Sequence, residues 1–313
     1  MNRRIAIKSA AATAAVTVLG VKMAGRAEAA VAAKAPVPGP GTTSAGVKPA
    51  ALSPVPCGIN YTNETVFDNA TSTKAQIVRI YHTPAQGIPS SLSADSQVLT
   101  ALKAGQQVIT SYKPSMPGTS AQVAAFTSWC ESVAGAGYAG EVWATVWHEP
   151  ENNFATAADY VAEYMQFQPA AAASGIKFGP IFTTYPFLRK GFVLANWMPA
   201  DDDFSYIGID HYAGADPAGT FTNPLQSISQ FTSYAKSRGK VFGIAETGVA
   251  PDLYTTAQTQ AEAAAFIEDY ESLGSSVRFM LMFNDPSADV DITANGGALI
   301  PAWQQLYNTL TTR

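Results

Sequence analysis

Strand-like runs alternate with helix-like segments along most of this chain, and that alternation limits the folds it can adopt. The eight predicted strands are Val55–Tyr61, Ile77–His82, Gln107–Tyr112, Glu141–Trp147, Lys177–Thr183, Phe204–Asp210, Val241–Ala245 and Arg278–Phe283. Strands joined through helices run parallel, because parallel neighbours need a crossover connection. Eight such units in about 260 residues predict one (β/α)8 barrel, the TIM-barrel class of α/β fold, over residues 55–313.

An open, doubly wound sheet is the alternative with the same alternation. Nucleotide-binding sheets of that kind carry a glycine-rich phosphate turn after the first strand, and no such turn follows Val55–Tyr61. The barrel is therefore favoured. Within it, Pro169 is expected to kink or break the helix predicted over Ala157–Ala173, because proline lacks the N–H that the helix needs.

The N-terminal part of the chain has the composition of an export signal and a linker. Residues 1–29 combine the basic Asn2-Arg3-Arg4, an apolar run and a small-x-small cleavage site at Ala27-Glu28-Ala29, and they resemble a twin-arginine signal. The run between Lys8 and Lys22 has 13 residues, fewer than the ~20 that span a bilayer. Residues 30–54 are rich in Pro, Ala and Gly, as in linkers. We expect a bacterial protein that is secreted or placed in the cell envelope, without a membrane anchor after cleavage.

The charge of the chain narrows the choice of partners. Five of the 19 Lys and Arg and one of the 24 Asp and Glu lie in residues 1–29, which leaves 14 basic and 23 acidic residues in the remainder. An acidic protein is a poor partner for nucleic acid or an anionic membrane. A neutral, hydroxyl-rich or cationic ligand is easier to accommodate.

Cysteine and histidine are too few to build a disulfide-stapled or zinc-rich module, with two and three residues respectively. Cys57 falls in the first predicted strand and Cys130 in the helix between the third and fourth. These elements are not neighbours in a barrel, so we expect two buried thiols and no disulfide.

Polar and aromatic residues gather where the predicted strands end, which is where barrels of this class place their active sites. Glu149 follows the fourth strand and Glu246 the seventh. Arg79 lies inside an apolar strand, where it either holds a catalytic carboxylate or closes a core ion pair. His211 and Tyr212 are available to orient Glu246. The candidate binding residues are Tyr61, Arg79, His82, Tyr112, Trp147, His148, Asn152, His211 and Tyr212.

Two carboxyl groups facing one another across a barrel mouth suit the hydrolysis of a glycosidic bond with retention of configuration, in which one protonates the leaving oxygen and the other attacks the sugar. Glu151 is a rival to Glu149, and the two cannot both be assumed to face the mouth. A zinc site formed by His82, His148, His211 and Asp210 is a further alternative. No His-x-His or His-Glu-x-x-His spacing occurs, so we expect neither metal nor cofactor.

Two segments resemble the paired-glutamate signature of the clan A glycoside hydrolases: Trp147-His148-Glu149-Pro150 and Gly243-Ile244-Ala245-Glu246-Thr247-Gly248. The resemblance implies that Glu149 is the acid/base and Glu246 the nucleophile. Most of the clan has Asn before the acid/base, whereas His148 is similar to glycoside hydrolase family 26. The eighth strand is a second departure, because Phe283 stands where the clan commonly has Trp.

The function that the resemblance implies is an exported, monomeric, retaining glycoside hydrolase that cleaves a β-linked poly- or oligosaccharide. Two alternatives stay open. One is a carbohydrate-binding barrel without turnover, and the other is a metal-dependent hydrolase.

Overall fold

The computed structural model describes residues 54–72, 74–188, 191–214 and 221–312. The export signal expected at residues 1–29 and almost all of the linker expected at residues 30–54 lie outside these ranges. Among the described residues, no helix is both long enough and apolar enough to cross a bilayer.

A sheet of nine strands, all paired in parallel, forms the centre of the structure in the order β5-β4-β3-β2-β1-β9-β8-β7-β6. The strands are β1 (Cys57–Asn60), β2 (Ile77–His82), β3 (Gln107–Tyr112), β4 (Val142–Val146), β5 (Lys177–Phe178), β6 (Ile181–Thr183), β7 (Tyr206–Tyr212), β8 (Val241–Gly248) and β9 (Val277–Met282).

The two ends of this sheet meet in one short segment of chain. β5 pairs with β4, β6 pairs with β7, and only Gly179 and Pro180 separate them. Pro180 has no N–H to donate to a neighbouring strand, so the ladder breaks there. The predicted strand Lys177–Thr183 therefore appears as two strands, and the predicted (β/α)8 barrel is confirmed with this division.

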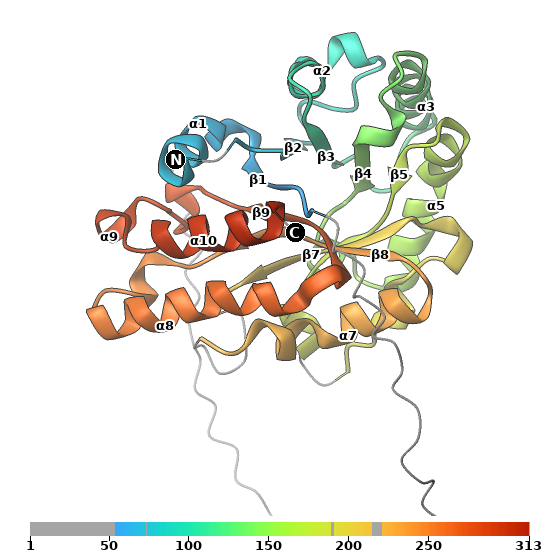
Figure 1. Cartoon of the computed structure of the whole chain (residues 1–313). Coiled ribbons are helices and arrows are strands. Elements are labelled where there is room, and N and C mark those ends of the chain that lie inside the picture. Colours follow the sequence, from blue (N-terminus) through green and yellow to red (C-terminus); the bar gives the residue numbers. More distant parts are fainter. Residues whose placement is uncertain (1–53, 73, 189–190, 215–220, 313) are drawn as a thin grey trace, which may run out of the picture. The chain divides into compact units, whose positions relative to one another are not determined.

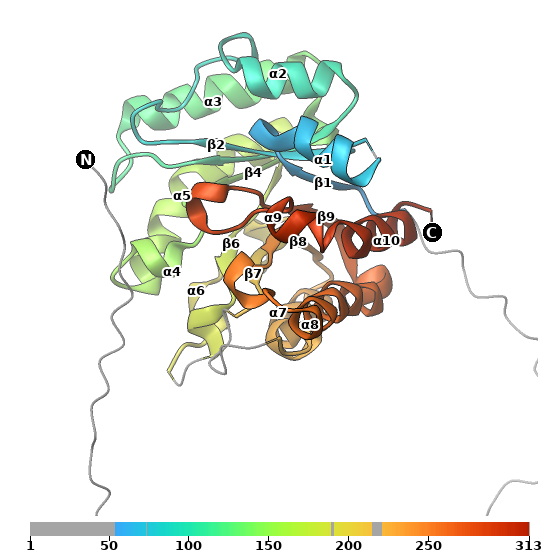
Figure 2. The same cartoon turned by 90° about the vertical axis from the view of Figure 1, so that its left-hand side faces the viewer.

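Helices surround the strands, which lie in the centre of the views in Figures 1 and 2. The helices are α1 (Glu64–Thr71), α2 (Ser96–Lys103), α3 (Ser120–Gly135), α4 (Pro150–Asn153), α5 (Ala157–Ser174), α6 (Leu194–Trp197), α7 (Pro224–Ser237), α8 (Ala257–Glu268), α9 (Ala294–Gly297) and α10 (Ile300–Thr311).

Helix α5 continues through Pro169, so the break expected there is wrong. Buried side chains flank the proline on both sides, with Tyr164 and Phe167 before it and Ala171 after it. This packing against the barrel outweighs the lost backbone hydrogen bond, since most helix stability in proteins comes from such burial.

Two apolar cores lie on opposite faces of the strands, because successive strand residues point to opposite sides. The inner core fills the barrel with Ile77, Ile109, Trp143, Ile181, Tyr206, Ala245, Phe279 and Leu281. The outer core lies between the strands and the helices and is much larger. On β2, Ile77 belongs to the inner core, whereas Val78 and Ile80 belong to the outer one.

Both cysteines are buried and no disulfide joins them, as the sequence predicted. Cys57 lies in β1 and Cys130 in α3.

Gly243, in β8, tests how tightly the barrel interior is packed. A Cβ atom at this position would lie 2.3 Å from ring atoms of Phe279. We expect Gly243→Ala to lower the free energy of unfolding by about 1–3 kcal/mol, because a filled core tolerates extra volume poorly. Urea denaturation measures the change.

The matched control is Gly135→Ala at the end of α3, where an added Cβ meets nothing within 4 Å. There we expect no loss, or a gain of up to about 1 kcal/mol, because alanine is the better helix former. Equal losses in the two variants would contradict a tightly filled interior.

Candidate active site

A buried arginine connects three strands beneath the mouth of the barrel. Arg79, in β2, is completely buried. Its Nη1 lies 2.7 Å from Oδ1 of Asp210 in β7 and 3.2 Å from Oε1 of Glu246 in β8. Arg79 therefore closes a core ion pair with Asp210 and also contacts the carboxylate of Glu246.

Glu246 is held by two tyrosines in addition to Arg79. The Tyr81 hydroxyl donates to Oε1 at 2.7 Å, and the Tyr212 hydroxyl donates to Oε2. Burial raises the pKa of both tyrosines well above the usual range, so both keep the proton that they donate. Both carboxylate oxygens of Glu246 are therefore held by hydrogen bonds. The contact with Tyr212 was expected from the sequence, and the contact with Tyr81 was not.

A β-bulge turns Glu246 into the barrel. Ile209 pairs with Ile244, but the next residue of β7, Asp210, pairs with Glu246, so Ala245 is an extra residue in β8. Ala245 belongs to the inner core, and strict alternation would therefore point Glu246 outward. The bulge resets the alternation, a common device next to active sites.

Glu149 lies just beyond β4, on a turn with unusual backbone angles. Trp147 and Glu149 have φ of 52° and 53°, in the left-handed region that residues other than glycine seldom adopt. The Glu149 N–H donates to Ile181 O at 2.7 Å, and the Asn153 side chain donates to Glu149 O at 2.7 Å. These bonds hold a strained turn of the kind that clusters at functional sites.

The surroundings of the Glu149 carboxyl differ from those of Glu246. Burial raises the pKa of Glu149, and the negative charge of Glu246 raises it further. The charge of Arg79 and a hydrogen bond from Asn152 to Oε2, at 3.4 Å, act in the opposite direction.

Glu151 has a different attachment from Glu149. Its Oε1 accepts the backbone N–H of Thr183, which ties α4 to β6. Burial raises the pKa of Glu151 well above its usual range, and its Oε2 has no partner among the described residues. The charge of Glu246 raises the pKa of Glu149, whereas Glu246 is not among the groups that shift the pKa of Glu151.

His148 and Trp147 directly precede Glu149, and each has a buried polar atom. The His148 ring meets Tyr81 edge-on, with ring centroids 5.6 Å apart. Burial, and then the charges of Arg79 and Lys113, lower the pKa of His148 well below its usual value, so the ring is neutral at pH 7. His148 Nδ1 and Trp147 Nε1 are buried without a hydrogen-bond partner in the described structure.

Three of the predicted binding residues lie on the other face of the strands. His82 stacks on Tyr112, with centroids 4.6 Å apart, and its Nε2 lies 3.3 Å from Asp95. His211 Nδ1 lies 2.5 Å from the hydroxyl of Tyr270. The structure therefore places His82, Tyr112 and His211 between strands and helices, away from the carboxyl pair.

Successive side chains of a strand point to opposite faces, and this alternation predicts from the sequence that His82 and His211 face the helices. Arg79 and Tyr81 point inward, so His82 between strand and helix follows from a period of two. The same period places His211 outward between Asp210 and Tyr212. Of the remaining candidates, Tyr61 starts the 3-10 helix that follows β1 and packs against the outer core, and Asn152 is exposed beside Glu149.

Two open depressions lie at the mouth, each of about 590 Å³. Tyr212 and Phe283 line the first, together with Asp289 of the loop after β9. Phe154 and Glu163 line the second, and the Phe154 ring contacts that of Trp147 at 5.7 Å. The first depression lies where β7, β8 and β9 end, and the second lies between the loop after β3 and helix α5.

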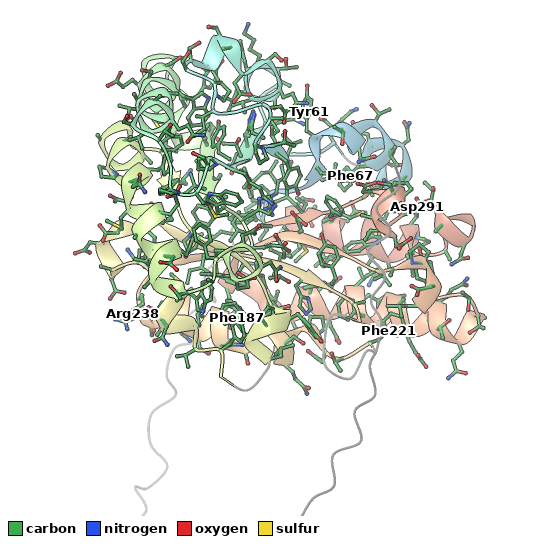
Figure 3. The ribbon with its side chains drawn as sticks, turned by 180° about the vertical axis from the view of Figure 1, so that it is seen from behind. Tyr61, Phe67, Phe187, Phe221, Arg238 and Asp291 are labelled. Atoms are coloured by element: carbon green, nitrogen blue, oxygen red, sulfur yellow. The ribbon has the colours of Figure 1, made fainter. Side chains whose placement is uncertain are left out.

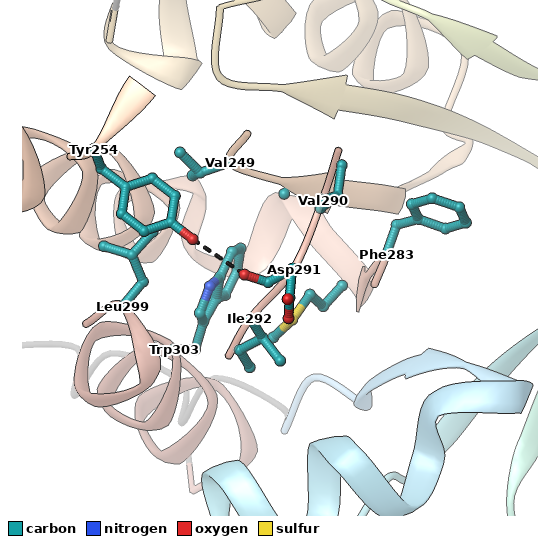
Figure 4. Close-up of a pocket in the computed structure, with 10 residues that line it drawn as sticks. Val249, Tyr254, Phe283, Val290, Asp291, Ile292, Leu299 and Trp303 are labelled. Carbon is teal, nitrogen blue, oxygen red and sulfur yellow. Dashed lines mark hydrogen bonds between the residues drawn. The ribbon is translucent and has the colours of Figure 1, made fainter. Parts of the chain in front are cut away.

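A small cavity lies behind the loop after β9 (Figure 4). Tyr254, Trp303 and Leu299 line it, and the Tyr254 hydroxyl donates to Asp291 O at 3.0 Å. Phe283 and Val290 line both this cavity and the first depression, so they form the partition between the two. No group of three or more His, Cys, Asp or Glu side chains that could hold a metal ion occurs among the described residues.

Comparison with known proteins finds matches to the fold of this chain and none to its sequence. No family model and no curated protein matches the sequence. Solved structures do match its fold. A β-mannanase of glycoside hydrolase family 26 from Bacteroides ovatus is 12% identical, with a TM-score of 0.51 over 83% of this chain and 90% of that one.

Two further structures agree with the first. A modular endo-β-1,4-mannanase of family 26 from Cellulomonas fimi is 15% identical, with a TM-score of 0.55 over 83% of this chain and 74% of that one. A family 5 glycoside hydrolase from Prevotella bryantii is 18% identical, with a TM-score of 0.52 over 78% and 86%. The fold is that of glycoside hydrolase barrels. The resemblance to family 26 inferred from the sequence is confirmed at the level of fold.

The coupling between the two glutamates can be measured without an activity assay. We expect Glu246→Gln to lower the pKa of Glu149, because the substitution removes a negative charge that favours its protonated form and leaves the Arg79 charge less neutralised. A ¹³C NMR titration of the glutamate carboxyls reports the value.

The control for this measurement is Asp159→Asn, which removes an exposed carboxylate of α5 that does not contribute to the pKa of Glu149. An unchanged Glu149 titration in Glu246→Gln would show that the two carboxyls do not interact.

Proposed function

We propose that this protein is a retaining glycoside hydrolase that cleaves a β-linked poly- or oligosaccharide by double displacement. The observation that carries the proposal is the contrast between the two glutamates. Arg79, Tyr81 and Tyr212 all present positive charge or O–H groups to Glu246, which suits a carboxylate nucleophile. Glu149 is half-buried and has a raised pKa, which suits a general acid.

The reaction then follows in two steps. In the first, Glu149 donates its proton to the glycosidic oxygen while a carboxylate oxygen of Glu246 attacks the anomeric carbon, so that the leaving sugar departs as an alcohol. In the second, Glu149 takes a proton from water as that water attacks the same carbon and releases Glu246. Asp210 keeps Arg79 in position throughout and does not touch the reacting atoms.

The mouth suits an uncharged, hydroxyl-rich chain. The depression beside Tyr212 and Phe283 offers room for sugars, and the Phe283 ring offers a surface complementary to the C–H groups of sugars. β-1,4-Mannan is the first substrate to test, because two of the similar structures are mannanases.

We further propose that residues 1–29 direct export and that the protein acts outside the cytoplasm as a monomer. Its partner is the carbohydrate substrate, with no nucleic acid, no membrane after signal cleavage and no cofactor.

Substitution of either glutamate tests the site. We expect Glu149→Gln and Glu246→Gln each to lower kcat by about 10³-fold or more, because each removes an essential proton donor or nucleophile. Release of reducing ends from mannan and other β-linked polysaccharides measures the activity. The control is Glu131→Gln, an exposed residue of α3 that should keep full activity.

Full activity in both glutamate variants would show that Glu149 and Glu246 are not the catalytic residues. Sugar binding by the unchanged protein with no release of reducing ends from any polysaccharide would support a binding barrel without turnover. Activity lost to chelators would support a metal-dependent hydrolase.

The stereochemistry of the product tests the mechanism separately. A double displacement inverts the anomeric centre twice, so we expect the β-anomer to appear first from a β-linked substrate. ¹H NMR of the first product, taken before mutarotation, distinguishes the anomers. Initial release of the α-anomer would exclude retention while leaving the glycosidase assignment intact.

A further inference from the structure

A cavity rich in positive charge lies at the base of the barrel, at the opposite end of the strands from Glu149 and Glu246. It has an open volume of about 780 Å³. Its cationic lining comes from three elements: Lys236 at the end of α7, Lys240 just before β8, and Arg278 in β9. The hydroxyl-bearing residues Thr232 and Ser276 also line it.

These three cations have no counter-charge in the described structure. None of Lys236, Lys240 and Arg278 has a carboxylate oxygen within 4.0 Å among the described residues, and no acidic residue lines the cavity. Arg238, on the same segment, differs, because its Nη1 lies 2.6 Å from Asp201 and it does not line the cavity. The cavity thus gathers three cations without an ion pair, with no acidic residue in its lining.

Local backbone features direct these side chains. Gly239, with φ of 64°, ends α7, and the Lys240 N–H bonds back to Ala235 O at 2.9 Å, as in a Schellman motif. The ammonium group of Lys240 lies over the Phe204 ring at 4.9 Å. In β9, the register shifts between its pairs Val277 and Met280, so that one extra residue is accommodated where Arg278 emerges.

The dipole of α7 explains the position of only one of the three cations. Lys236 lies in the last turn of α7, where a cation is favoured by the helix dipole. Lys240 and Arg278 lie outside that helix and belong to the barrel strands or their entry. In a chain whose acidic residues outnumber its basic ones, three unpaired cations around one hollow form a site for an anion.

We propose that this cavity binds a phosphate-type oxyanion carrying at least two negative charges, either as a small phosphate or as part of a polyphosphate chain. Lys236, Lys240 and Arg278 supply the charge, and Thr232 and Ser276 supply hydroxyl donors. Figure 3 shows Arg238, beside this cavity, on the opposite side of the barrel from Asp291 in the loop after β9. Occupation of the base therefore leaves the carboxyl pair open, and the site is independent of the proposed hydrolase activity.

Calorimetric titration of the whole protein at about 0.15 M salt tests the proposal, with pyrophosphate as one probe and long-chain polyphosphate as the other. We expect saturable binding that weakens as salt is raised. We expect the triple variant Lys236→Gln, Lys240→Gln, Arg278→Gln to bind about tenfold or more weakly, since three charge contacts are lost. Equal binding per phosphate of the two probes points to a small ligand, and much tighter binding of the chain points to a polymer.

The control variant is Arg238→Gln, which removes a neighbouring cation that is already paired. It should bind both probes as the unchanged protein does. Because Arg278 is exposed, the single variant Arg278→Gln keeps the test valid if the triple variant does not fold. Absence of binding by both probes, undiminished binding by the triple or the single variant, or an equal loss in Arg238→Gln would each overturn the proposal.

Discussion

The buried guanidinium of Arg79 is the constraint on which the rest of the site depends. A charge removed from water costs several kcal/mol unless opposite charge and hydrogen bonds compensate it. Here the compensation comes from Asp210 and Glu246, on two strands more than a hundred residues away, with Ser111 Oγ at 3.5 Å from Nη2. The barrel must therefore close correctly for Arg79 to be tolerated, and a correctly closed barrel places Glu246 at its mouth. Fold and candidate chemistry rest on the same contacts.

The barrel interior is divided into an apolar base and a charged upper layer. Trp143, Tyr206 and Phe279 pack their rings together below Arg79, with centroids 5.1 to 5.9 Å apart. Gly243 leaves the space that the Phe279 ring occupies. This filling keeps water away from the Arg79 layer from below, so its electrostatic interactions are stronger than at a surface.

Much of this arrangement could be predicted from the sequence, and the exceptions have identifiable causes. Hydrophobic runs separated by helix-like segments predicted the barrel. A glutamate just after an apolar run marked Glu149 and Glu246 as candidate site residues. Counting in twos from Arg79 would also have assigned His82 to the outer face. Counting in twos along β8 fails at Glu246, because the extra residue Ala245 shifts the alternation of side-chain direction. A bulge arises from pairing between two strands, and the local sequence of one strand does not encode it.

By itself, the sequence determined which segments are strands, that they run parallel, and which residue types stand at their ends, because these follow from local periodicity and chain connectivity. Only the tertiary structure decided which of those residues share one space. It joined Arg79, Tyr81 and Tyr212 around Glu246, bent the backbone at Trp147 and Glu149 into a strained turn, and divided Lys177–Thr183 between two neighbours. The physical reason is that register, bulges and strained turns are set by contacts between segments distant in the chain, whose energies exceed the local preferences.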